Sequence, residues 1–202
     1  MRYVSGTGTG LGVALLALLL AGCNDRQKPS EGDGTVARDH EGVRPEGVSS
    51  TDAPLTSTYY IPQATIGDMY EVEAAGIASE RTRNPAIRAF AARMTEDHGK
   101  TMSELQSFVA ANPVNRAPAQ SLDPRRRAMI DNLKNASDAE FDEVYLGQQA
   151  AAHDEAFYLH SSFANNGDDP KLQELAGRTA ELIQHHKRML TELGSGGAQE
   201  TQ

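Results

Sequence analysis

The chain has 202 residues, with 19 basic and 28 acidic side chains and a formal net charge of −9. This acidic balance argues against binding to nucleic acid and against electrostatic attachment to anionic lipid. The single cysteine excludes a disulfide within one chain.

The first 22 residues have the features of a secretory signal peptide. A short basic start precedes 11-LGVALLALLLAG-22, an apolar stretch too short to span a bilayer comfortably. The stretch ends at 20-LAGC-23, which resembles the lipobox of bacterial lipoproteins. That resemblance implies cleavage before Cys23, lipidation of its thiol and anchoring in the envelope, facing the periplasm. Asn24 in place of Asp favours the outer membrane, and an ordinary secretory signal is the alternative interpretation.

The segment 23–56 is predicted to be a disordered tether that begins at the lipidated cysteine. It is rich in Gly, Pro, Asp, Glu and Ser and has almost no large apolar residue. Such a composition cannot bury enough apolar surface to offset the entropy of the chain. We expect the folded domain to occupy residues 57–194 and a disordered tail to occupy residues 195–202.

Helical periods dominate the predicted domain. The first helix is expected from about Ile61 to Arg81, with Pro62 in its first turn. Its expected inner face comprises Ile66, Met69, Tyr70, Glu73 and Ile77. The second helix should begin with Asn84 as N-cap and Pro85 at its first position, and end near Ala111.

Three further helices follow a proline-rich loop. A short helix is expected over about 124–134, and 137-SDAE-140 has the pattern of a capping box for a long helix ending near Asn165. The last helix should start after Asp169 and end near 193. No period of two persists along the chain, so we predict an all-α, antiparallel four-helix bundle with a short extra helix.

The helical segments resemble the DUF4142 family of bacterial exported proteins. The matching stretches are 71-EVEAAGIA-78, 84-NPAIRAFAARMTEDH-98, 141-FDEVYLGQQAAAH-153 and 170-PKLQELAGRTAELIQHH-186. The resemblance implies a ferritin-like helical bundle and places the histidines of the family pattern at His98, His153 and His186. Glu181 stands where the family usually has proline, and the family name assigns no function.

Four residues on four predicted helices form the candidate metal site: Glu73, His98, His153 and His186. A ferritin-type di-iron centre requires Glu-x-x-His pairs. No histidine of this chain has a carboxylate three residues before it. The sequence therefore argues against di-iron chemistry.

A softer copper site is the second candidate. Met94, His98 and Met102 are spaced by four residues, as are His185 and Met189, and thioether with imidazole suits copper(I). Two alternatives remain open, since methionine also fills irregular cores and a buried histidine also pairs with a carboxylate. The expected carboxylate partners are Glu73, Asp97, Asp154 and Glu181.

The leading interpretation is a non-enzymatic envelope lipoprotein that acts through protein contacts or in stress tolerance. Its expected partners are the membrane, through the lipid anchor, and an envelope protein, with no cofactor. The alternative is a ferritin-like protein that binds copper, zinc or iron or protects against redox damage. An enzyme is the weakest class because no nucleophile lies in a recognisable motif. Convergence of the three histidine rings would favour the metal-binding alternative.

Overall fold

The computed structural model describes residues 55–112 and 117–196. The predicted signal peptide, Cys23 and the tether up to residue 54 lie outside the described residues. Within the described ranges the chain forms five helices and no strand. The helices are α1 (Ser57–Arg81), α2 (Pro85–Ala111), α3 (Pro124–Asn135), α4 (Phe141–Asn166) and α5 (Pro170–Gly196).

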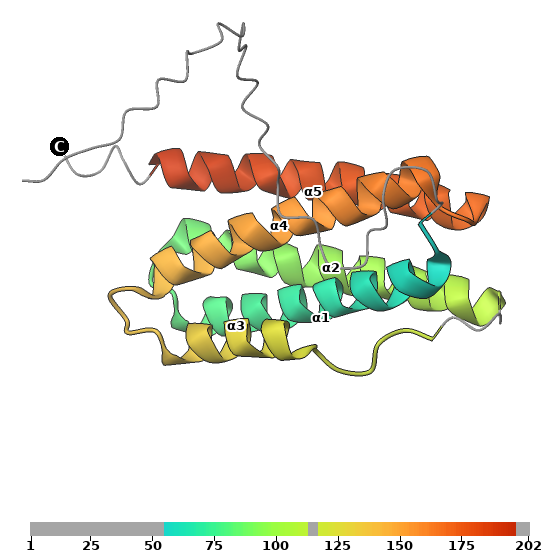
Figure 1. The fold of residues 1–202 in the computed structure, drawn as a ribbon. Coiled ribbons are helices and arrows are strands. Elements are labelled where there is room, and N and C mark those ends of the chain that lie inside the picture. Colours follow the sequence, from blue (N-terminus) through green and yellow to red (C-terminus); the bar gives the residue numbers. More distant parts are fainter. Residues whose placement is uncertain (1–54, 113–116, 197–202) are drawn as a thin grey trace, which may run out of the picture. The chain divides into compact units, whose positions relative to one another are not determined.

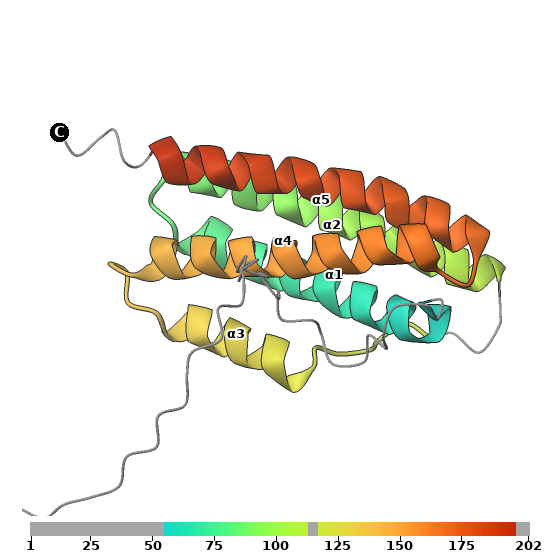
Figure 2. The same cartoon turned by 45° about the horizontal axis from the view of Figure 1, so that its top comes forward.

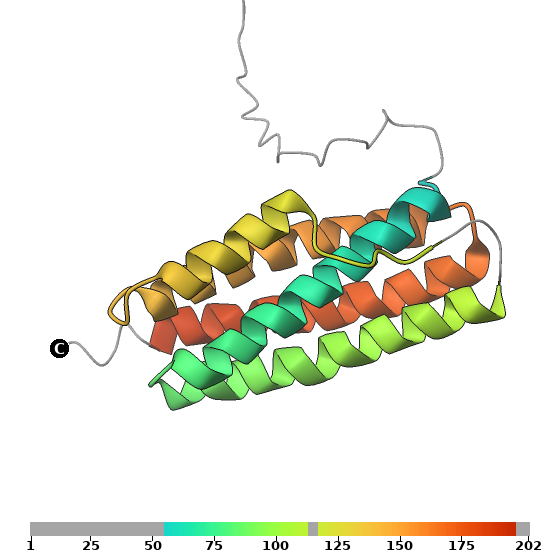
Figure 3. The same ribbon diagram turned by 90° about the horizontal axis from the view of Figure 1, so that it is seen from below.

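The four long helices form a bundle in which α1 packs chiefly on α2, and α4 chiefly on α5 (Figure 1). Contacts of α1 with α4 and of α2 with α5 close the bundle (Figure 2). The short α3 lies outside it, against α1 and α4 (Figure 3). The predicted all-α bundle with one short extra helix is confirmed. No helix in the described ranges is both long and apolar enough to cross a membrane.

The first helix begins four residues earlier than predicted, at Ser57. The side chain of Thr56 caps it, and Oδ1 of Asp168 accepts a 2.8 Å hydrogen bond from the Ser57 amide. Asp168 belongs to the α4–α5 connection, more than 100 residues away. A contact of this range leaves no local sequence signal, and it places Pro62 one turn deeper in the helix than expected.

Two of the predicted helix starts are confirmed by their caps. Oδ1 of Asn84 accepts from the Ala86 amide at 2.9 Å, with Pro85 at the first helical position. Oδ1 of Asp169 accepts from the Lys171 amide at 3.0 Å. In both cases the cap residue satisfies an amide that the helix itself leaves unpaired.

The predicted capping box at the start of α4 is wrong. The Ser137 hydroxyl donates to the Glu140 carboxylate at 2.6 Å, so neither side chain caps an amide. Asp138 in the same turn pairs with Arg81 at 3.3 Å and with Arg83 at 3.2 Å. These ion pairs between distant parts of the chain occur where residues 138–140 form a turn, and the helix begins only at Phe141.

The predicted inner face of α1 is confirmed for Tyr70, which is fully buried, but it is wrong for Glu73, because this helix has two apolar sides. The fully buried side carries small residues and two carboxylates, and includes Ala64, Asp68, Glu71, Ala74, Ala75 and Ala78. The larger Ile66, Met69 and Ile77 are only partly buried. Because Tyr60, Ile61 and Tyr70 are also fully buried, the size of a residue alone does not show which side of α1 faces the core.

Candidate metal centre

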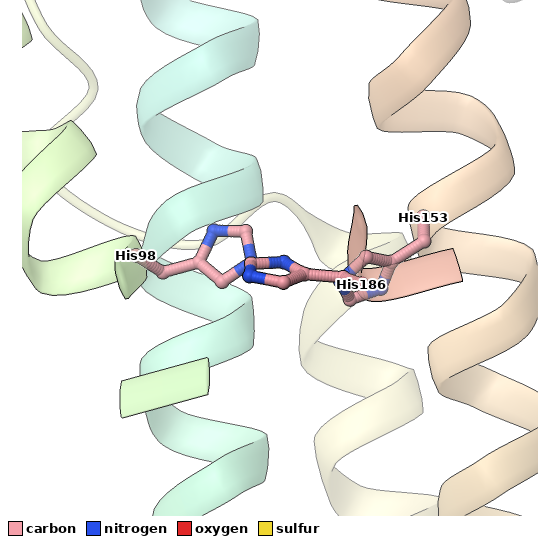
Figure 4. A group of neighbouring side chains, drawn as sticks. All are labelled: His98, His153 and His186. Carbon is pink, nitrogen blue, oxygen red and sulfur yellow. The ribbon is translucent and has the colours of Figure 1, made fainter. Parts of the chain in front are cut away.

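Three histidines from three helices meet in the bundle core (Figure 4). His98 comes from α2, His153 from α4 and His186 from α5, with exposed fractions of 2%, 0% and 0%. We call them the histidine cluster. Their ring centroids are 5.3, 5.4 and 5.6 Å apart, a nearly equilateral triangle. One ring nitrogen from each lies within 4.8 Å of the other two.

Each ring of the histidine cluster uses its other nitrogen in a hydrogen bond at its outer side. Each of the three contacts is 2.9 Å long. They join His98 Nδ1 to Asp68 Oδ1, His153 Nδ1 to the main-chain carbonyl oxygen of Gln149, and His186 Nε2 to Asp97 Oδ2. Histidine ligands of metals are typically oriented in this way by a carboxylate or carbonyl. For His153 and His186, whose outer partners only accept, the outer hydrogen bonds also fix which nitrogen carries the proton when the ring is neutral.

The inner nitrogens of His153 and His186 consequently present lone pairs to each other. A carbonyl oxygen can only accept, so Nδ1 of His153 carries a proton and Nε2 of the neutral ring is bare. In His186 the proton is on Nε2, which donates to the Asp97 carboxylate, so Nδ1 of the neutral ring is bare. These two bare nitrogens are 3.3 Å apart. Nε2 of His98 is buried and has no hydrogen-bond partner within the described part of the chain.

The spacing of the rings fits one shared metal ion. An ion about 2.0–2.1 Å from each nitrogen would lie about 3.2 Å from each ring centroid. Tetrahedral to trigonal geometry then places the centroids about 5.2–5.6 Å apart and the nitrogens about 3.3–3.6 Å apart. The centroid separations of 5.3–5.6 Å and the nitrogen separation of 3.3 Å agree with these values.

Burial keeps the rings of His98 and His186 neutral. Desolvation lowers the pKa of His98 to about 4, with the nearby Glu71 carboxylate opposing the shift. Desolvation likewise lowers the pKa of His186 to about 3. Neutral imidazole is the form that binds a metal, so no proton has to leave these two rings at neutral pH.

The two carboxylates that orient the rings differ in their protonation. Burial would raise the pKa of Asp97, but hydrogen bonds from His186 and Arg93 outweigh it and leave that pKa below its usual value. Burial raises the pKa of Asp68 to about 7, although a hydrogen bond from Thr101 lowers it in part. Asp97 is therefore a carboxylate at neutral pH, and Asp68 is close to its midpoint.

The structure brings three of the four predicted ligands together and leaves out Glu73. The Glu73 side chain faces α3, where its Oε1 is 3.2 Å from Arg127 and 3.0 Å from Lys134. Glu71 is the glutamate of α1 that faces the core. Its Oε2 accepts from Gln149 at 2.7 Å, and its Oε1 is 3.7 Å from His153 Nδ1.

The secondary candidates are dispersed. Met94 is fully buried in the hydrophobic cluster one turn before His98, whereas Met102 is only partly buried. Met189 packs against the edge of the same cluster, and His185 is exposed. His185 and Met189 therefore form no pair on the inner face, because the adjacent His186 takes the inward position.

Of the expected carboxylate partners, only Asp97 contacts the histidine cluster. Asp154 pairs with Lys187 at 2.7 Å, and Glu181 is exposed. Sequence reasoning missed Asp68 as a partner. The signal that could have found it is the alanine stripe of α1, since Asp68 lies one turn after Ala64 on the same helical face.

Comparisons with known proteins give a family and a fold. The model of a domain of unknown function, DUF4142, matches residues 44–193. No curated protein is significantly similar in sequence. A solved DUF305 fragment from Deinococcus radiodurans is 12% identical with a TM-score of 0.60, over 68% of this chain and 93% of that chain.

Two structures of CopM are also similar. The Cu(I)-bound form is 17% identical with a TM-score of 0.59, over 70% of this chain and 97% of that chain. The Cu(II)-bound form is 16% identical with a TM-score of 0.61, over 71% of this chain and 98% of that chain. At such identities the likeness shows a shared fold and nothing more.

Proposed function

The chain belongs to the DUF4142 family of domains of unknown function, and we propose that this member binds one transition-metal ion through its histidine cluster. The three ligands are His98 Nε2, His153 Nε2 and His186 Nδ1. Asp68, Asp97 and the Gln149 carbonyl serve as the orienting second layer. Three protein nitrogens leave a fourth coordination position for water or another small ligand.

The facing lone pairs of His153 and His186 carry this proposal. Two bare nitrogens 3.3 Å apart repel each other unless a cation lies between them. A proton could bridge these two nitrogens, but it would leave His98 Nε2 buried without a partner in the described ranges. A metal ion satisfies all three nitrogens at once, which a proton cannot do.

The donor set favours copper and zinc. Imidazole nitrogen suits zinc, copper, nickel and iron, and the general order of affinity among the divalent ions peaks at copper. The ligand set lacks the bridging carboxylates of a di-iron centre. CopM, a protein of the same fold with Cu(I)- and Cu(II)-bound structures, adds support for copper.

We further propose that the protein holds its metal in the bacterial envelope and does not turn over a substrate. The resemblance of 20-LAGC-23 to a lipobox supports a lipid anchor at Cys23, with the domain facing the periplasm from the outer membrane. All three ligands are at least 98% buried, which suits retention of an ion better than access by a substrate.

Metal titration of the purified protein tests the proposal. Wild-type protein should bind one Cu(II) or Zn(II) per chain by calorimetry, and His186→Ala should lose that binding. His185→Ala is the matched control, because His185 precedes His186 on α5 but is exposed. Equal binding by wild type and His186→Ala would contradict the assignment, as would no binding by wild type.

A further inference from the structure

We propose that the metal ion reaches the histidine cluster through one pocket between α1 and α4, guided by the carboxylates of Asp68 and Glu71. This inference rests on the proposed function and adds the route of uptake and release. The pocket has a volume of about 80 Å³ and is lined by residues of α1, α4 and the start of α3. Among the three ligands only His98 lines it, so the ion would meet His98 first.

The inner wall of the pocket attracts cations. Asp68 and Glu71 both line it, and their exposed fractions of 4% and 3% place them deep in the bundle. Asp68 already holds His98 at 2.9 Å. A carboxylate with so little water around it interacts strongly with a cation because the local dielectric is low. Together they offer an incoming ion oxygen ligands next to its first nitrogen ligand.

The outer end of the pocket carries an ion-paired cluster at the start of α3. Arg125 and Arg126 both donate to the Glu155 carboxylate of α4, with contacts of 2.9 Å from each. Glu155 therefore offsets positive charge at the mouth, which would otherwise repel an incoming cation. Removing the charge of Glu155 should slow uptake, and added salt should reduce that effect.

Gly67 supplies a place where the pocket can be narrowed without disturbing the core. It lies within α1 and lines the pocket, and a Cβ at this position would meet no atom within 4 Å. A leucine there would extend into open space, and replacing a glycine inside a helix favours the helix. Gly76 is the matched control, since it lies on the same helix in equally open space but does not line the pocket.

Rapid-mixing kinetics with Zn(II) or Cu(II), and release into a chelator, test the route. If the pocket is the passage, Gly67→Leu should slow uptake and release by the same factor, about tenfold or more, with the dissociation constant unchanged. A narrower passage raises the activation free energies of uptake and of release equally. It does not change the free energies of the metal-free and metal-bound protein. Gly76→Leu should keep wild-type rates. Glu155→Gln should slow uptake, because it leaves the positive charge of Arg125 and Arg126 at the mouth unbalanced.

Each other outcome overturns one identifiable claim. Tight binding with wild-type rates in both Gly67→Leu and Glu155→Gln would overturn the route and leave the metal site intact. A changed dissociation constant in Gly67→Leu with an unchanged uptake rate would also overturn it, because the pocket would then belong to the site itself. Failure of wild type to bind any metal would overturn the proposed function, and the inference with it. Thermal melting shows that each variant is folded before the kinetics are compared.

Discussion

Nε2 of His153 and Nδ1 of His186 face each other at 3.3 Å, and the outer hydrogen bond of each ring leaves the facing nitrogen without a proton when the ring is neutral. This contact destabilises the metal-free protein, since two hydrogen-bond acceptors are held together in a buried site. It is therefore the feature of this fold that most directly indicates a bound cation.

The first prediction concerns Asp68, which orients His98. Asp68→Asn should weaken metal binding by about 10–100-fold, the usual effect of losing a second-layer partner of a histidine ligand. Calorimetric titration measures this change. Asp154→Asn is the control, because Asp154 lies in an exposed ion pair with Lys187 and should not affect affinity. Equal affinities for the two variants would show that Asp68 does not orient a ligand.

The second prediction separates the two glutamates of α1. Glu73→Gln removes ion pairs with Arg127 and Lys134 at the surface and should cost about 0–1 kcal/mol of unfolding free energy. It should leave metal affinity unchanged, because Glu73 faces α3. Chemical denaturation and metal titration measure the two quantities. A large loss of metal binding in Glu73→Gln would restore the ligand role that its sequence position suggested.

The third prediction is that the metal-free domain loses stability on acidification. Burial lowers the pKa of His98, His160 and His186 to about 4, 4 and 3, so the unfolded chain binds more protons than the folded one below pH 6.5. The contribution of these histidines to the unfolding free energy is fully present above about pH 6.5. It is lost as the pH falls toward their pKa values in the folded protein. Asp68, whose pKa is raised to about 7, acts in the opposite sense, losing stability as pH rises from about 4 to 7.

Three histidines outnumber one aspartate, so the net effect is loss of stability in acid. Denaturant unfolding of the chelator-treated protein at pH 7 and pH 4.5 measures it. His160→Gln should reduce the slope between these values by at most one proton, about 1.4 kcal/mol per pH unit. His160 suits this test because it contacts Tyr60 at 2.7 Å and is not a ligand in the proposed site. A flat stability profile would contradict the assignment of neutral buried rings.

The fourth prediction concerns the anchor. Cys23→Ser should move the protein from the membrane fraction to the soluble periplasmic fraction, because the thiol is the expected site of lipid attachment. Stable anchoring takes more than one acyl chain, and none would remain attached in the variant. Fractionation followed by immunoblotting measures the shift, with wild type as the reference. Membrane retention of Cys23→Ser would show that the lipobox resemblance is misleading.

The helices could be predicted because their signals are local. The Asn84–Pro85 and Asp169–Pro170 pairs mark helix starts through short-range geometry that the sequence displays directly. The early start at Ser57 could not be predicted in this way. It depends on Asp168, a residue distant in the sequence that the fold brings to the amide of Ser57.

The candidate site was predictable in part. The resemblance of the helical segments to the DUF4142 family implied the positions of His98, His153 and His186, and His98 also interrupts an apolar helical stripe. Asp68 and Glu71 could not be ranked above Glu73, because α1 packs against α3 as well as the core and shows apolar residues on both sides. The alanines of α1 mark the side that faces the histidines, but Ile66, Met69 and Ile77 on the other side give a competing apolar signal in the sequence.

X-ray absorption spectroscopy of the protein loaded with one equivalent of Cu(II) or Zn(II) tests the central claim most directly. The proposed site predicts three imidazole nitrogens at about 2.0–2.1 Å from one ion, with one fewer in His98→Ala. A first shell made only of oxygen atoms, or a spectrum that His98→Ala leaves unchanged, would contradict it.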